Sequence, residues 1–237
     1  MKKVISFITK KGGTGKTTTA LCVAHQLTRL NKKVLLIDMD AQCNLTKTFI
    51  DIKESVSVFD SLVSKLPADP VKINSMLFLL KGDPRMNDLP LALKGTYSVF
   101  ALRTLIEGLS DFDVVIIDSP PKMDLETRNA IQASDILVSV IQPEQYSVDG
   151  FETFMEDLKN EHAVLDHIVV NMAKNLNAHK KIIEGLKVKY GDILCNTIIP
   201  DDTKVREAAI ERKLLMDYKP YSRANLAFEQ LIKELWA

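Results

Sequence analysis

The 237-residue sequence has little cysteine and no excess charge of either sign. Its three cysteines, Cys22, Cys43 and Cys195, are far apart and odd in number, so they suggest neither a disulfide framework nor a Cys-x-x-Cys metal site. Because 31 basic residues balance 31 acidic ones, any contact with nucleic acid must come from a local patch. No apolar run approaches the roughly 18 residues that span a bilayer, and the apolar run after the basic N-terminus is too short for a signal peptide. We therefore expect a soluble protein of the cytoplasm.

Short β-branched apolar runs alternate with longer stretches of helical periodicity. The short runs are apolar at consecutive positions, which is typical of strands covered on both faces. We expect strands at Val4–Ile8, Val34–Ile37, Met76–Leu80, Val114–Ile117, Ile136–Ile141, Ile168–Asn171 and Thr197–Ile199. We expect helices at Thr17–Leu30, Thr127–Ala133, Val148–Asn160 and Lys180–Lys189. This alternation predicts an α/β fold with a doubly wound, mostly parallel sheet flanked by helices.

The organisation of the chain indicates a single domain over residues 1–237. The sequence contains no internal repeat, low-complexity tract or linker, and its length suits one α/β domain. The segment at about 53–93 is less regular and contains four of the nine prolines, so we interpret it as an insertion. Open parallel sheets bind ligands at the carboxyl ends of their strands, and we expect the functional residues there.

A glycine-rich loop lies between the first predicted strand and the first predicted helix, in the order VISFI, TKKGGTGKTT and TALCVAHQL. The general phosphate loop, G-x-x-x-x-G-K-[ST], would place a glycine where this chain has Lys10. The glycines nevertheless let the backbone approach phosphate oxygens, and the free N–H groups of the following helix point at the anion. Lys16 can reach the β- and γ-phosphates, and the Thr17 hydroxyl can ligate Mg²⁺. The alternative, a glycine turn before an ordinary helix, is disfavoured by the Gly-Lys-Thr triplet in this context.

Acidic residues follow two further predicted strands. Asp38 and Asp40 come at the end of one in LLIDMDAQCN, where acids can hold Mg²⁺ through water and orient an attacking water. Asp118 ends the apolar run of VVIIDSPP, a Walker B pattern, and the turn that follows suits a switch that senses the γ-phosphate. A solvated loop is the alternative for the first pair, since loops favour Asp and Asn. Beside a phosphate loop, the three strand ends predict a site for ATP and Mg²⁺.

In this order and spacing, KKGGTGKTT, IDMDAQCN and IDSPP resemble the ParA/MinD ATPases, P-loop NTPases with a deviant Walker A loop, K-G-G-x-x-G-K-[ST]. The resemblance implies that two subunits sandwich two ATP molecules and that Lys11 reaches across to the partner's nucleotide, with Lys10 an ordinary neighbour. It implies catalytic roles for Lys11, Lys16 and Asp40, the last positioning the hydrolytic water. It places Mg²⁺ near Thr17, Asp38 and Asp118. The phosphate-binding residues are then Lys11, Gly12, Gly13, Thr14, Gly15, Lys16, Thr17 and Thr18.

The resemblance continues into the C-terminal half and covers nearly the whole chain except about 53–93. VVNMAKN places Asn171 where the family contacts adenine, and IIPDD places Pro200, Asp201 and Asp202 on the adenine-side loop. The ending LLMDYKPYSRANLAFEQLIKEL resembles that of plasmid and chromosome partition ATPases. The chain departs from the family motif Asp-Pro-Gln-Gly-Asn, with Ala41 and Cys43 in place of proline and glycine. We expect this departure to alter the rate of hydrolysis without abolishing it.

Two types of ATPase related to this family can be distinguished from this chain by the residues that each would need. The nitrogenase iron protein would need cysteines after the switch strands, and none lies between Cys43 and Cys195. A MinD-type membrane ATPase would need a C-terminal helix with a basic face, whereas FEQLIKELWA carries Glu229, Lys233 and Glu234. We therefore expect no stable membrane association and expect the apolar residues of the tail to pack on the sheet.

Basic residues in the C-terminal third are candidates for non-specific contact with DNA phosphates. The candidates are Lys180, Lys181, Lys187, Lys189, Arg206, Arg212, Lys213 and Arg223. A solvated helix face is the alternative, because most charge runs are only that. Nearby acids dilute the second half of this set.

The function predicted from these residues and this resemblance is that of a ParA-type ATPase for plasmid or chromosome partition. An ATP-dependent sandwich dimer would bind DNA non-specifically and associate with the nucleoid, and a ParB-like centromere-binding protein would stimulate hydrolysis. One alternative is a MinD-like or other ATPase that positions a different cargo. Another is an ATP-dependent metabolic ligase of the dethiobiotin synthetase type, which would need an organic-substrate pocket beside the γ-phosphate.

Overall fold

The computed structural model of the chain describes residues 2–49, 55–95 and 97–236. In these ranges the strands form one seven-stranded sheet in the order β3-β4-β2-β5-β1-β6-β7. Neighbouring strands run parallel except β3 and β4, which pair antiparallel. The strands are β1 (Lys3–Ile8), β2 (Val34–Asp38), β3 (Val71–Lys72), β4 (Leu77–Leu80), β5 (Val114–Asp118), β6 (Ile136–Ile141) and β7 (His167–Val170). The predicted α/β fold with a mostly parallel sheet is confirmed.

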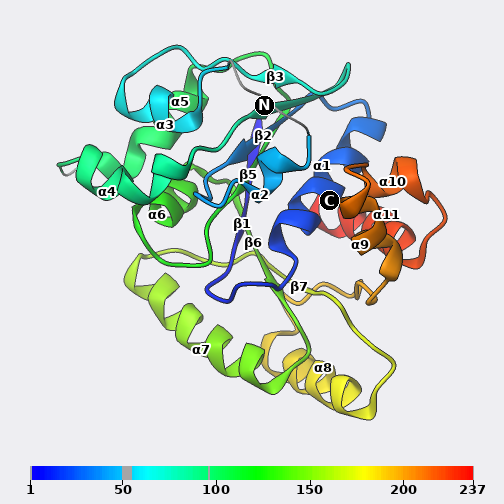
Figure 1. Cartoon of the computed structure of the whole chain (residues 1–237). Coiled ribbons are helices and arrows are strands. Elements are labelled where there is room, and N and C mark those ends of the chain that lie inside the picture. Colours follow the sequence, from blue (N-terminus) through cyan, green and yellow to red (C-terminus); the bar gives the residue numbers. More distant parts are fainter. Residues whose placement is uncertain (1, 50–54, 96, 237) are drawn as a thin grey trace.

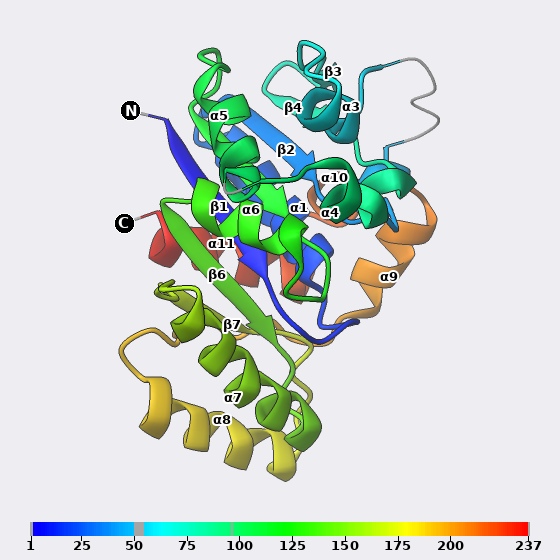
Figure 2. The same cartoon turned by 90° about the vertical axis from the view of Figure 1, so that its left-hand side faces the viewer.

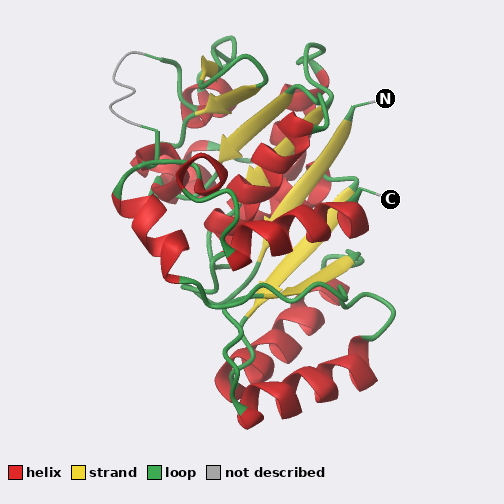
Figure 3. Cartoon of the chain, turned by 90° about the vertical axis from the view of Figure 1, so that its right-hand side faces the viewer, coloured by secondary structure: helices red, strands yellow, loops and turns green. Residues whose placement is uncertain are grey.

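Helices cover both faces of the sheet, with α1 and α9–α11 on one side, α3–α6 on the other, and α7 and α8 beside β6 and β7 (Figures 1, 2 and 3). The longer helices are α1 (Lys16–Arg29), α5 (Ala101–Glu107), α6 (Leu125–Ala133), α7 (Gln145–Asn160), α8 (Asn177–Tyr190), α9 (Thr203–Ile210) and α11 (Arg223–Leu235). The shorter ones are α2 (Asn44–Lys47), α3 (Val58–Val63), η1 (Pro84–Asp88), α4 (Leu89–Ala92), η2 (Ser98–Phe100) and α10 (Leu215–Tyr218). Every predicted helix is present within a few residues of its expected start.

The central strands are apolar at consecutive positions because successive side chains enter different cores. In β2, Leu36 packs in the cluster beneath α1 and α11, whereas Leu35 and Ile37 pack in the cluster beneath α3, α5 and α6. In β5, Ile116 and Ile117 divide in the same way. A third cluster joins β6 and β7 to α7 and α8. Both faces of the sheet are therefore buried, as the sequence pattern predicts.

One predicted strand is wrong. The residues Thr197–Ile199 are not a strand, although the Ile199 N–H donates to the Val170 carbonyl (2.9 Å) and the Ala173 N–H donates to the Ile199 carbonyl (3.0 Å). The segment runs beside β7, but within the described ranges it makes only one isolated bridge, between Ala173 and Pro200, and the Asp201 N–H then donates to the Ala173 carbonyl (2.9 Å). The short strand β3 was not predicted, since two residues carry no readable pattern.

The less regular segment predicted at about 53–93 contributes directly to the sheet. Residues 53 and 54 lie outside the described residues. β4 lies between β3 and β2 and pairs parallel with β2, so that Leu80 is level with Ile37. α3 begins at a capping box in which Ser57 and Asp60 exchange hydrogen bonds. The description of this segment as an insertion, like the single domain over 1–237, stays a prediction.

The C-terminal helix α11 packs on the sheet beside α1. Phe228, Leu231 and Leu235 are each at most 2% exposed and belong to the same cluster as β1 and β2. Glu234 accepts hydrogen bonds from the backbone N–H groups of Asn196 (2.7 Å) and Thr197 (2.9 Å), which ties α11 to the segment before α9. None of the helices in the described ranges is both long and apolar enough to cross a membrane.

Candidate active site

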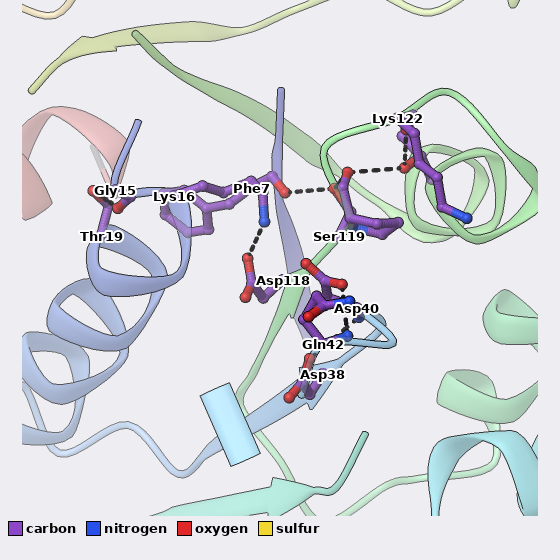
Figure 4. A network of polar contacts seen from close by, with 12 residues as sticks. Phe7, Gly15, Lys16, Thr19, Asp38, Asp40, Gln42, Asp118, Ser119 and Lys122 are labelled. Atoms are coloured by element: carbon purple, nitrogen blue, oxygen red, sulfur yellow. Dashed lines mark hydrogen bonds and ion pairs between the residues drawn. The ribbon is translucent and has the colours of Figure 1, made fainter. Parts of the chain in front are cut away.

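The three motifs singled out from the sequence meet at the carboxyl edge of the sheet. In the pairing of β1, β5 and β2, Phe7 is level with Asp118, and Asp118 is level with Asp38. The loop at 9–15 leaves β1 at this edge and returns as α1. Figure 4 shows Lys16 from α1 directed at Asp118, with Asp38 and Asp40 on the far side of that carboxylate. The predicted convergence on one site is therefore what the fold produces.

Glycine is required at two points of the loop. Gly13 and Gly15 have φ of 78° and 84°, a left-handed conformation that residues with a Cβ rarely adopt. A Cβ on Gly15 would also lie 2.2 Å from the Asn171 side-chain nitrogen. The first turn of α1 follows without a side-chain cap, so its N–H groups remain available to an anion.

Lys16 and Asp118 form a buried ion pair. The Lys16 ammonium lies 2.5 Å from one Asp118 oxygen, and the two side chains are 6% and 0% exposed. The other Asp118 oxygen and the Thr14 hydroxyl are buried without a hydrogen-bond partner in the part of the chain that the structure describes. Unpartnered buried polar atoms are rare unless a ligand completes them. Together with the open space above Gly12 and Gly13, they make the residues fit a nucleotide phosphate with Mg²⁺.

Asp38 is a buried carboxylate held from two sides. One oxygen accepts hydrogen bonds from the Thr46 N–H (2.9 Å) and hydroxyl (2.7 Å), and the other accepts one from the Asp40 N–H (3.2 Å). The Thr46 hydroxyl accepts a hydrogen bond from the Gly82 N–H (2.9 Å). Burial raises the pKa of Asp38 to about 7, and the charge of Asp118 adds to the rise against the effect of these donors. Such a carboxylate ionises readily only when a cation shares its site.

The raised pKa of Asp38 gives the nucleotide-free protein a specific pH dependence. An unfolded Asp ionises near pH 4, so between about pH 4 and 7 the folded state binds the extra proton, and stability falls as the pH rises. We expect the stability difference between the Asp38→Asn variant and the wild type to shift by about 2 kcal/mol in favour of asparagine from pH 5 to pH 8. Urea denaturation of both proteins without Mg²⁺ at the two pH values measures the shift. A constant difference would show that Asp38 is already ionised when the chain is free.

Asp40 lies two residues beyond the end of β2 and is held differently. It is 9% exposed, one of its side-chain oxygens accepts the Gln42 N–H (2.9 Å), and its carbonyl accepts the Cys43 N–H (2.8 Å). Cys43 has a φ of 52°, in the left-handed region that favours glycine. The family's glycine at this position therefore has a physical reason, and the turn after Asp40 persists here with cysteine in a strained conformation.

All three cysteines are buried free thiols. Burial raises the pKa of Cys43 to about 11 and those of Cys22 and Cys195 to about 12, so each thiol stays protonated at neutral pH. We expect a disulfide reagent such as DTNB to label the native protein at least tenfold more slowly than a free thiol, and to titrate three thiols in denaturant. Rapid labelling of one native thiol, assigned by mass spectrometry, would contradict the structure.

The two lysines that open the loop are both bound to α7. Lys10 forms an ion pair with Asp157 (2.6 Å). Lys11 donates a hydrogen bond to the Ser147 hydroxyl (2.8 Å) and lies 3.5 Å from Glu144. Lys10 is therefore more than the ordinary neighbour expected from the sequence. The reach of Lys11 to a partner's nucleotide stays a prediction, and in the isolated chain its ammonium is held by its own subunit.

The predicted adenine-side residues lie beside the loop. The Asn171 amide donates to the Thr14 carbonyl (2.8 Å), while its oxygen accepts the Met172 N–H. Asp202 caps α9 by accepting the Lys204 N–H (3.0 Å) and also accepts the Ala224 N–H (3.2 Å), and these backbone bonds lower its pKa against the effect of burial. Both Asp202 oxygens are thus engaged in holding helices. Adenine contact by Asn171 and by the segment at 200–202 stays a prediction.

The eight basic residues proposed for DNA fall on two separate sets of elements. Lys180, Lys181, Lys187 and Lys189 lie on α8, and the three arginines and one lysine between 206 and 223 lie on or beside α9–α11. Ion pairs join Lys189 to Glu152, Arg206 to Asp201 and Lys213 to Glu211. Lys180, Lys181, Lys187 and Arg212 make no ion pair with any described residue. The charge that is free for phosphate is therefore mainly on α8.

Sequence reasoning missed the residues that hold the functional side chains. Thr46 donates to Asp38, Gly82 donates to the Thr46 hydroxyl, Ser147 holds Lys11, and the Gln142 amide donates to the Gly13 carbonyl (3.2 Å). Thr46 lies in a polar run eight residues after Asp38, and a reader of the sequence could have noticed that a threonine follows the acidic motif. Gly82 and Ser147 are brought to the site by tertiary packing, which leaves no local signal.

Comparison with known proteins agrees with this geometry. The sequence model of a family described as AAA domain matches residues 2–170. The sporulation initiation inhibitor protein Soj of Bacillus subtilis is 30% identical over 251 residues, covering 100% of this chain and 99% of that protein. The chromosome-partitioning ATPase Soj of Thermus thermophilus is 29% identical over 242 residues, covering 98% and 95%. A putative plasmid partition protein from Borrelia burgdorferi, bound to AMPPNP, shares the fold with a TM-score of 0.84 at 21% identity over 100% of both chains.

These similarities run from end to end, so they include the segment at 53–93 that the motif resemblance had left out. The phosphate loop, the acids at the ends of β2 and β5, and the unpartnered atoms at Thr14 and Asp118 are the parts that ATP hydrolysis with Mg²⁺ requires. The chain therefore belongs to the ParA/MinD family of P-loop ATPases, close to the ParA-type partition ATPases, and it hydrolyses ATP with Mg²⁺.

Proposed function

We propose that this ATPase is a DNA-partition switch whose ATP-bound form is a dimer that binds DNA without sequence preference. A ParB-like centromere-binding protein would stimulate hydrolysis and release the dimer. The observation that carries the proposal is the second lysine of the loop. Lys16 already supplies the buried cation beside Asp118, and Lys11 lies at the half-exposed start of the same loop. Because Lys16 already provides the cation within its own subunit, Lys11 is available to bind the nucleotide of the other subunit.

The chain's own residues have separable roles in the reaction. A water attacks the γ-phosphorus in line with the bond to the β–γ bridging oxygen, which breaks and leaves ADP and phosphate. Asp40 orients that water, while Lys16 exchanges its Asp118 partner for phosphate oxygens and offsets the developing charge. Asp38, Asp118 and Thr17 would hold Mg²⁺, which neutralises the β- and γ-phosphates when bound. Lys11 would complete the site from the neighbouring subunit.

ATP would stabilise the dimer because each nucleotide contacts both subunits, so that dimerisation is linked to the γ-phosphate. Two basic surfaces presented together bind a polyanion far better than one, since the second contact is intramolecular. The relatives named for chromosome and plasmid partition support DNA as the cargo. We place the protein in the cytoplasm, associated with the nucleoid when it is bound to ATP.

The structure favours α8 over α9–α11 as the surface that contacts DNA. A Lys180→Gln/Lys187→Gln protein should bind duplex DNA about tenfold more weakly in ATP and show a shallower salt dependence, because two phosphate contacts per subunit are lost. An Arg206→Gln/Lys213→Gln protein is the matched control, since both residues are paired with carboxylates. Fluorescence anisotropy over a range of salt concentrations measures both effects.

The proposed function is tested in the same assay by changing the nucleotide. The wild type should bind DNA at least tenfold more tightly with ATP than with ADP, and phosphate should be released without consumption of an organic substrate. Equal affinity in the two nucleotides would contradict an ATP-gated dimer. An equal loss of DNA affinity in the α8 variant and its control would contradict the assignment of α8 as the DNA-binding surface. It would not contradict the ATP-gated dimer.

A further inference from the structure

We propose that Thr46, backed by Gly82, is a positioning residue for ATP hydrolysis because it fixes the carboxylate of Asp38. The proposal rests on the proposed role of Asp38 beside Mg²⁺. Asp38 is 0% exposed, and among the described residues Thr46 supplies two of the three hydrogen bonds that reach its carboxylate. Both Thr46 donors converge on one carboxylate oxygen and so fix the rotation of the carboxyl group about its χ2 bond.

The direction of the Thr46 hydroxyl is fixed by Gly82. A hydroxyl has one proton to donate and two lone pairs to accept with. The Gly82 N–H donates to the Thr46 oxygen at 2.9 Å, and the hydroxyl proton is directed to Asp38 at 2.7 Å. The chain of bonds therefore runs from the backbone of Gly82, through the hydroxyl, to the carboxylate. The remaining oxygen of Asp38 accepts only the longer bond from the Asp40 N–H (3.2 Å) among the described residues.

There is also no room for a side chain between Gly82 and Asp38. A Cβ at this position would lie 2.9 Å from the carboxyl carbon, 3.0 Å from the oxygen that Thr46 binds and 3.2 Å from the Asp38 carbonyl. Gly82 follows β4, whose parallel pairing with β2 sets Leu80 level with Ile37 and so brings the two strand ends to the same height. The segment that carries β4 thus forms one wall of the acid's pocket. Any side chain there would displace either the carboxylate or the end of β4.

This arrangement assigns a function to two elements outside the three sequence motifs. α2 carries Thr46 and β4 leads to Gly82, so a shift of either element would rotate Asp38. Residues that orient a metal-linked ligand typically change metal affinity or activity by 10- to 100-fold when they are removed. The expected signature is a weaker dependence of nucleotide binding on Mg²⁺, with the fold intact.

The test compares threonine variants that differ only in the hydroxyl. Thr46→Val keeps the shape and the N–H but removes the hydroxyl, and Thr46→Ser restores it. Thr48→Val is the matched control, because that hydroxyl bonds the Asn44 carbonyl at the other end of α2 (3.1 Å). The readout is the Mg²⁺ concentration that half-saturates binding of a fluorescent ATP analogue, measured beside the urea midpoint of each protein.

We expect Thr46→Val and Gly82→Ala to raise the half-saturating Mg²⁺ concentration at least tenfold, while Thr46→Ser and Thr48→Val stay within about twofold of the wild type. If Thr46→Val matches Thr48→Val, the proposal is overturned. Asp38→Ala separates this failure from a failure of the proposed site. If Asp38→Ala shifts the Mg²⁺ dependence and Thr46→Val does not, the positioning role of Thr46 is wrong and the assignment of Asp38 is retained. If Asp38→Ala has no effect, the assignment of Asp38 to the Mg²⁺ site is wrong, and so is the role of Thr46 that rests on it.

Discussion

Replacing Asp40 by alanine is expected to give a protein that binds ATP and forms the dimer but hydrolyses ATP at least 100-fold more slowly. Asp40 lies at the carboxyl end of β2, buried except for 9% of its surface, with its carboxylate oriented by the Gln42 N–H. The bonds that shape the phosphate loop join other residues, namely Lys16 to Asp118 and Asn171 to Thr14. Removing the Asp40 carboxylate therefore removes the group that orients water and leaves the phosphate-binding contacts in place.

Single-turnover phosphate release and size-exclusion chromatography with ATP measure the two halves of this prediction. Asp69→Ala is the matched control, since it removes an exposed carboxylate just before β3 and should change neither turnover nor dimerisation. A monomer in saturating ATP would contradict the trapped dimer. Turnover within a few-fold of the wild type would show that another group orients the water.

The sequence was sufficient to predict the parts of the site that obey local rules. Gly13 and Gly15 could be assigned to the loop from the sequence because their positive φ values exclude most other residue types. Asp118 could be identified because it ends an otherwise fully apolar strand. The sheet followed from runs that are apolar at consecutive positions, which only strands buried on both faces need. These features are encoded within a few residues of one another, so one sequence reveals them.

The parts that could not be predicted depend on contacts between distant segments. Thr46 and Gly82 lie 36 positions apart and meet only because β4 pairs with β2. Thr197–Ile199 has the composition of a strand, but its backbone bonds to the end of β7 and to Ala173 give only one isolated bridge among the described residues, at Pro200. The sequence shows that acids lie near Arg206 and Lys213, but only the fold shows which ion pairs form, including the pair between Lys189 and the distant Glu152. The sequence shows which residues are charged, but only the packing shows which of them are not engaged in ion pairs.

Lys11→Gln is expected to abolish ATP-dependent dimerisation and to lower turnover by about 10³-fold, the effect of removing a charge that one subunit supplies to another's phosphate. In the isolated chain the Lys11 ammonium is bound to Ser147 and close to Glu144. These contacts lie at the start of α7 and compete with any contact across a dimer. Ser147→Ala removes one of these contacts, so it should lower the ATP concentration needed for dimerisation by about threefold. This change corresponds to less free energy than a full hydrogen bond to a charged group contributes.

Lys10→Gln is the control for Lys11→Gln because the two residues are adjacent and both bind α7. Lys10 pairs with Asp157 at a partly exposed position, and such pairs contribute about 1 kcal/mol or less. We expect the Lys10 variant to lose a little stability and to keep both dimerisation and turnover, measured by analytical ultracentrifugation with ATP and by phosphate release. If both variants lose dimerisation equally, the loop lysines act by holding α7 within one subunit. If only Lys11→Gln does, Lys11 acts across the dimer, and a lower ATP requirement in Ser147→Ala would then show that Ser147 competes with the partner's nucleotide for its ammonium.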